Sequence, residues 1–86
     1  MKLSLSVPIT AAAQSLAALA GTDYRQTVYT ILQAPSGNAQ NILIGDNASQ
    51  PGFLIPGGTL VLERISLSDT FVRGTGGDDI ILLVLN

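Results

Sequence analysis

Apolar and polar residues alternate at the start of the chain, in the segment Leu3-Ser4-Leu5-Ser6-Val7. This alternation is typical of a β-strand with one face against a core. Residues 59–63 alternate in the same way, with Leu60 and Leu62 on one side. Residues 80–85 form instead an unbroken apolar run, IILLVL. Such a run indicates a strand covered on both faces, one by the core and the other by a helix or a neighbouring subunit.

β-Branched and aromatic residues predict further extended segments between these three. The additional strands are expected over residues 26–33, 41–44, 53–55, 65–67 and 70–73. Gly, Pro, Asn and Asp separate them, at residues 34–38, 45–47 and 50–52 and at a bend over 68–69. Pro56-Gly57 suits the two central positions of a type II turn. The glycine-dense segment 74–78 reads as a hairpin connection between the last two strands.

A single helix is predicted over residues 10–20, where alanine predominates. Thr10 is an acceptable N-cap, and Gly21 suits the position just past the helix end. Leu16 and Leu19 would give this helix a narrow apolar face. A helix of about 11 residues is marginal alone in water, so it has to dock on the rest of the domain.

The pattern as a whole predicts a mainly β protein. We expect a small antiparallel β-sandwich or barrel of about seven short strands with one short N-terminal helix, forming a single domain over residues 1–86. No internal repeat or linker divides the chain. The opening segment is a poor signal peptide because Leu and Ser alternate in it and Pro8 interrupts it.

The composition changes the picture from a lone domain to a subunit. The chain has 86 residues, of which 47% are hydrophobic and only 12% charged, and it contains neither Cys nor His. A small domain has a thin core and usually needs a staple or a partner. Disulfides and the common transition-metal ligands are missing, so a partner remains. We therefore expect a homo-oligomer, with a monomer whose apolar residues are well hidden as the alternative.

No arrangement of residues predicts catalysis, a cofactor site or a metal site. Activated Ser or Cys chemistry needs a nearby base, and the chain has no His and only one lysine, Lys2. Most of the six acidic residues lie in predicted turns, where Asp commonly bonds the backbone. The segment 74–77 lacks the lysine and the following helix of a phosphate loop. The net charge of −2 and four scattered basic residues disfavour nucleic acid, and no run approaches the length of a membrane span.

Candidate contact residues can still be named. Spread aromatic residues are more often part of a core than of a stacking platform, although a surface role stays open for some of them. Arg73 stands just before the glycine turn, where Asp78 or Asp79 would be its expected ion-pair partner. The predicted subunit-contact residues are Leu16, Leu19, Tyr29, Phe53, Phe71 and Arg73.

The order of these segments resembles that of a known class of proteins. The segments are the opening strand, TAAAQSLAAL from Thr10, NILIGD from Asn41, LIPGG from Leu54 and FVRGTGGD from Phe71. Together they are similar to small virion structural proteins of tailed bacteriophages, especially capsid decoration (cement) proteins. The resemblance covers nearly the whole chain but rests on turn and strand signatures. It implies a homotrimer on the capsid surface, with the major capsid protein or other virion proteins as partners and no catalytic residue.

Two alternatives remain open at this point. A neck, tail or fibre-base protein of the same kind of virion would have the same composition but few copies per particle. A carbohydrate- or receptor-binding module would need exposed aromatic and polar side chains in one groove. An enzyme is the weakest interpretation, and a buried carboxylate pair in a cleft would be its mark.

Overall fold

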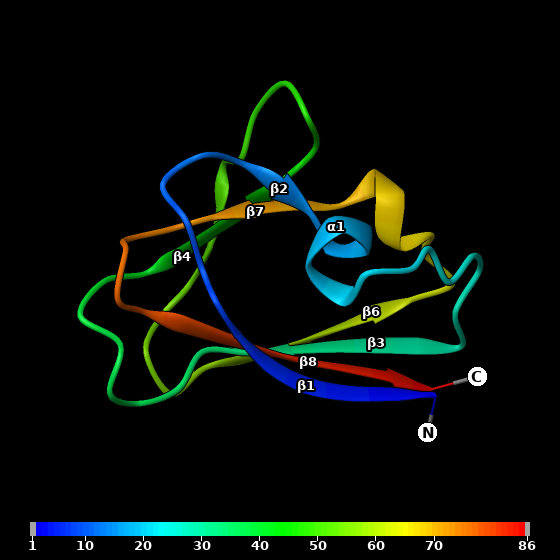
Figure 1. The fold of residues 1–86 in the computed structure, drawn as a ribbon, viewed down its shortest axis with the longest axis horizontal. Helices are drawn as coiled ribbons and strands as arrows, with labels where there is room; N and C mark the ends of the chain where they lie inside the picture. The colour runs from blue at the N-terminus through cyan, green and yellow to red at the C-terminus, as the bar shows by residue number, and fades with distance from the viewer. Residues whose placement is uncertain (1, 86) are drawn as a thin grey trace.

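The chain passes repeatedly between two antiparallel sheets that face each other (Figure 1), as seen in a computed structural model that describes residues 2–85. The first four-stranded sheet, sheet A, has the order β1 (Leu3–Pro8), β8 (Asp79–Leu85), β3 (Tyr29–Gln33), β6 (Thr59–Glu63). The second, sheet B, has the order β2 (Gln14–Ser15), β7 (Phe71–Arg73), β4 (Ile42–Gly45), β5 (Gly52–Leu54). The predicted mainly β class is confirmed, and the architecture is that of a small sandwich.

Only β4 and β5 are both consecutive in the chain and paired with each other. The prediction of a hairpin at residues 74–78 is therefore wrong, because β7 belongs to sheet B and β8 to sheet A. A tight turn does form there, with the Asp78 N–H donating to the Thr75 carbonyl at 3.1 Å and Gly77 at φ 94°. The turn carries the chain across the sandwich instead of back along the same sheet.

The helix is shorter than the alanine-rich segment predicts. Helix α1 spans Leu16–Ala20, and the Ser15 side chain caps it by accepting from the Ala18 N–H at 3.0 Å. Thr10 is therefore not the N-cap. Residues 14–15 join sheet B as β2, and the Leu16 N–H donates to the Thr70 carbonyl at 2.9 Å. Gly21 ends the helix at φ 78°, as predicted.

Residues 65–67 were expected to be extended, yet a 3₁₀ helix, η1, spans Leu67–Asp69. Its Ser68 N–H donates to the Asp23 carboxylate at 3.1 Å, and Leu67 is fully buried. Burial raises the pKa of Asp23, but hydrogen bonds from Ser68 and the charge of Arg25 outweigh this effect. The pKa of Asp23 is therefore lowered. Long-range side-chain bonds of this kind replace the local extended preference.

The type II turn at Pro56-Gly57 is confirmed. The Gly58 N–H donates to the Ile55 carbonyl at 2.8 Å, and Gly57 has a φ of 84°, which favours glycine. This turn leads directly into β6, so it sets where the edge strand of sheet A begins.

The core lies between the two sheets and is filled from both. In β8, every second residue points inward, and Ile80, Leu82 and Val84 have no exposed surface. The remaining buried apolar side chains of the core are Ile9, Leu16, Leu32, Ala34, Ile42, Ile44, Leu54, Leu67 and Val72. Two buried hydroxyls, those of Thr27 and Thr30, satisfy each other at 2.8 Å.

A buried carboxylate holds the β3–β4 loop against the start of β8. Asp78 is only 5% exposed, and its two carboxylate oxygens accept from the Ala39 N–H at 2.8 Å and the Gln40 N–H at 3.0 Å. Beside it, the Asn38 side chain donates to the Asp79 carbonyl at 2.8 Å and accepts from the Asp79 N–H at 3.0 Å. These bonds join a loop between the sheets to the crossing that enters sheet A.

Replacing Asp78 should destabilise the protein strongly. Asp78→Ala leaves two backbone donors without their charged acceptor, so we expect a loss of roughly 2–4 kcal/mol in the free energy of unfolding. Asp79→Ala is the matched control, because the Asp79 side chain is exposed and only its backbone bonds Asn38. Urea unfolding followed by circular dichroism measures both variants. Equal losses for the two would contradict the role given to the Asp78 carboxylate.

Candidate functional site

The outer face of sheet A is apolar over its middle. The side chains that alternate with the core residues of β3, β6 and β8 point outward there. We call this surface the A face, and its apolar residues are Tyr29, Ile31, Val61, Ile81, Leu83 and Leu85. Val61 is 52% and Tyr29 is 41% exposed, whereas the other four are half-buried by their neighbours.

The strand register arranges these side chains in rows across the sheet. One row runs from Ser4 through Leu83 and Ile31 to Val61. The neighbouring row places Leu85, Tyr29 and Glu63 side by side. Polar residues thus lie on β1 and at the two ends of β6, whereas the apolar stripe crosses β8 and β3 and reaches the β6 edge at Val61. A contiguous stripe with a polar rim is the usual form of a contact surface.

No element among residues 2–85 covers the A face. Figure 1 shows α1 between the two sheets, on their inner side, where its Leu16 enters the core. Of the two covers that the sequence predicted for the second face of residues 80–85, the helix is therefore excluded. A neighbouring subunit remains the cover to be tested.

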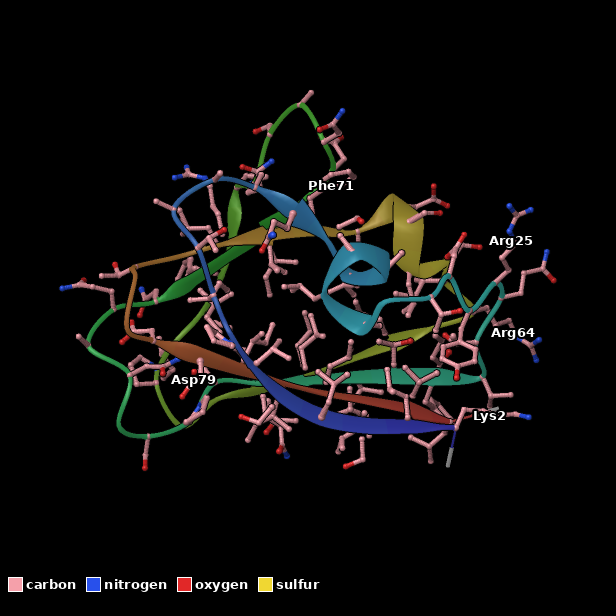
Figure 2. The ribbon with its side chains drawn as sticks, viewed as in Figure 1. Lys2, Arg25, Arg64, Phe71 and Asp79 are labelled. Atoms are coloured by element: carbon pink, nitrogen blue, oxygen red, sulfur yellow. The ribbon has the colours of Figure 1, made fainter. Side chains whose placement is uncertain are left out.

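Sheet B presents a second outer surface, which we call the B face. It carries Leu43, Phe53, Phe71 and Arg73, which alternate with inward residues of their strands. Figure 2 shows Phe71 on this outer side of the sandwich. Phe53 is 65% exposed, the highest fraction among the exposed large apolar residues.

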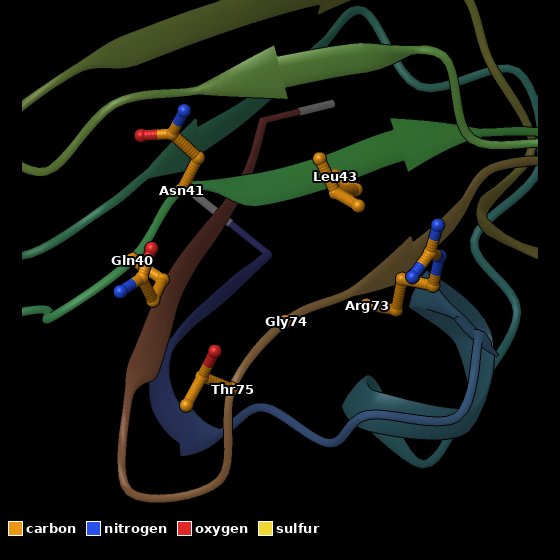
Figure 3. A pocket seen from close by; sticks show the side chains of 6 residues that line it. All are labelled: Gln40, Asn41, Leu43, Arg73, Gly74 and Thr75. Atoms are coloured by element: carbon orange, nitrogen blue, oxygen red, sulfur yellow. The ribbon is translucent and has the colours of Figure 1, made fainter.

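An open hollow of about 540 Å³ lies on the B face (Figure 3), and its lining consists of Gln40, Asn41, Leu43, Arg73, Gly74 and Thr75. The Arg73 Nε donates to the Gln50 side-chain oxygen at 2.9 Å. Arg73 is therefore tied to the β4–β5 loop, and its expected pairing with Asp78 or Asp79 is wrong. Asp78 instead bonds the backbone of the β3–β4 loop.

The structure separates the six contact residues that the sequence predicted. Phe53, Phe71 and Arg73 come together on the B face, and Tyr29 lies on the A face. Leu19 is half-buried against the core. Leu16 is fully buried, so it belongs to the core of this chain and to no surface.

Apart from Tyr29, sequence reasoning missed the outward apolar residues of β3, β6 and β8. Their signal was present in the run 80–85. Strand alternation gives its even-numbered residues to one face, and the odd-numbered Ile81, Leu83 and Leu85 to the other. The run does not show which strands pair with β8, so the other residues of the stripe could not be identified from the sequence.

The charged residues of the chain form no reactive cluster in the described part. Residues 2–85 contain no group of three or more acidic residues placed to hold a metal ion. The ion pair between the Arg25 Nε and the Asp23 carboxylate, at 3.4 Å, is largely exposed on the arginine side. No described helix has the length and hydropathy needed to cross a membrane.

No family model, curated protein or solved structure matches the chain. A function for the chain is therefore argued from the A face and the B face.

Truncation of two neighbouring residues of β8 should lower stability by very different amounts. Leu82→Ala leaves a cavity in the core and should lower the free energy of unfolding by about 2–5 kcal/mol. Leu83→Ala removes a half-exposed side chain of the A face and should cost under about 1 kcal/mol. Thermal unfolding of both variants measures the contrast. A large loss for Leu83→Ala would mean that the A face stabilises the isolated chain and is not a spare surface.

Proposed function

We propose that the chain is a non-enzymatic structural protein of a bacteriophage virion, which stabilises the capsid by packing its A face on the outside of the shell. The observation that carries the proposal is the unpartnered apolar stripe over β8, β3 and β6 of sheet A. A chain with 12% charged residues and no catalytic arrangement suits such a role. The similarity of its segment order to decoration proteins supplies the choice of partner, the major capsid protein.

The apolar stripe offers more than a site for one small ligand. It lies on the outer face of a sheet and extends over three neighbouring strands. Flat apolar surfaces with polar rims suit protein partners, whereas small molecules bind in concave pockets. Packing there would remove the exposed Val61 and Tyr29 side chains from water and stabilise both partners.

Counting copies per virus particle tests the proposal first. Quantitative mass spectrometry of purified particles should find hundreds of copies in a fixed ratio to the major shell protein. A handful of copies would instead assign the chain to the neck, tail or fibre base. Absence from all particles would contradict every virion role.

A charge on the stripe should then release the protein from the shell. Leu83→Lys places an ammonium group in the middle of the A face, so we expect at least a tenfold loss of copies retained on particles. Thr75→Lys is the matched control, because it adds the same charge beside the hollow of the B face. If both variants lower retention equally, the A face is not the surface that contacts the shell.

The hollow of the B face favours a second candidate, a carbohydrate- or receptor-binding module. Amide, hydroxyl and guanidinium groups surround the apolar Leu43 there, and Phe53 is exposed on the neighbouring strand. Such polar groups around an apolar floor can orient a sugar.

A glycan array probed with the purified protein tests this candidate. Binding that Arg73→Ala weakens at least tenfold, while Lys2→Ala leaves it intact, would support the module. An array without any bound glycan would remove it.

A further inference from the structure

The four sheet edges of the sandwich are not equally protected. β2 has two residues, and β5 has three and lies between Pro51 and Pro56. β1 follows Lys2 and ends at Pro8. Short edges, prolines and lysines are the features by which natural sheets block pairing with another chain. β6, with five residues and the sequence TLVLE, contains no proline or lysine, and Glu63 is its one charged residue.

The free edge of β6 presents an uninterrupted set of backbone groups. At its two ends, the Gly58 carbonyl accepts from the Ala34 N–H at 3.0 Å and the Arg64 N–H donates to the Val28 carbonyl at 3.4 Å. Both groups therefore point toward the β3 side. Because direction alternates in an antiparallel ladder, the residues whose N–H and C=O point away from β3 are Thr59, Val61 and Glu63.

We propose that a second copy of this chain pairs with that edge, β6 antiparallel to β6, about a two-fold axis at Val61. Val61 then lies opposite Val61 of the second copy, and Thr59 opposite its Glu63. Each of the three residues with outward backbone groups exchanges a pair of hydrogen bonds with its opposite. No like charges meet, since the Glu63 side chains are four residues apart along the ladder, or about 13 Å.

The area of the A face favours a second copy over a strand from another protein. Four strands about 4.8 Å apart and about 18 Å long give a face of roughly 350 Å². One A face alone is therefore under half of the area of about 800 Å² per partner that a stable interface, here the one with the shell, buries. An axis perpendicular to the sheet makes both A faces point the same way, so the pair offers roughly 700 Å² on one eight-stranded sheet. A foreign strand would satisfy the edge without doubling this face.

A two-fold pair also differs from the trimer that the resemblance implies. A ring of three copies joined by strand pairing needs two different edges that fit each other. The opposite edge of sheet A is β1, which ends at Pro8. Self-pairing through β6 needs only the unprotected edge. The inference rests on the proposed function in one respect, because the area of the A face is what favours a second copy over a foreign strand; the availability of the β6 edge does not depend on that function.

Sedimentation velocity of the purified protein from about 1 to 100 µM tests the pairing, as a monomer–dimer equilibrium in this range is expected. Val61→Pro removes the N–H at the two-fold axis, and proline is tolerated on an edge strand. We expect its dimer dissociation constant to rise at least tenfold. Val61→Thr is the control, because it keeps the N–H and the β-branched shape and should still dimerise. Circular dichroism verifies that both variants are folded.

Amide hydrogen exchange in the unmodified protein gives a second readout that no substitution can disturb. The N–H groups of Thr59, Val61 and Glu63 should exchange at least tenfold more slowly at high than at low protein concentration. Those of Leu60 and Leu62, which face β3, should exchange at the same rate throughout.

Three results would overturn the pairing: a monomer at every concentration, a trimer, or a dimer that Val61→Pro leaves intact with unprotected β6 amides. The number of copies per particle tests the proposed function independently of the pairing. A β6 dimer together with absence from all particles would keep the pairing and remove the virion role. A strict monomer found in hundreds of copies per particle would do the reverse.

Discussion

Strand β8 is the element on which the rest of the sandwich depends, because it is bonded along both edges and apolar on both faces. β1 pairs with one of its edges and β3 with the other, so sheet A has no continuity without it. Its inward residues fill the middle of the core, and its outward residues supply half of the apolar stripe. The same alternation therefore creates the stability of the chain and the surface through which we propose that it acts.

The chain has no cysteine to form a disulfide, and polar bonds between distant segments hold the domain together with its core. Asp78 and Asn38 join the β3–β4 loop to the entry of β8, and Asp23 does the same for η1. Each of these side chains bonds backbone groups that have no partner in a strand. Residues that look like ordinary turn residues in the sequence thus hydrogen-bond segments that are far apart in the chain. Two of the six acidic residues, Asp23 and Asp78, are thus engaged in bonds within the fold.

The sequence predicted what depends on neighbouring residues and missed what depends on distant ones. The strand at 59–63, the Pro56-Gly57 turn and the Gly21 helix end follow from local patterns, and all are present. The helix start was misplaced because the Thr70 carbonyl draws Leu16 into sheet B pairing, an interaction across 54 positions of the chain. Residues 74–78 have the composition of a hairpin, but composition does not tell which sheet each flanking strand joins. The residues of the A face could not be identified for the same reason, because its rows combine strands from distant parts of the chain.

The pairing of β1 with β8 has a consequence for how sheet A forms during folding. Leu3 lies opposite Val84, so this pair joins residues that are 81 positions apart in the chain. β3 also borders β8, and without β8 it forms only a two-stranded ribbon with β6, which is marginal in water. Sheet A is therefore completed by long-range contacts, which slow folding. Until β8 is in place, the apolar residues of β1 and β3 lack their neighbours, and aggregation competes with folding.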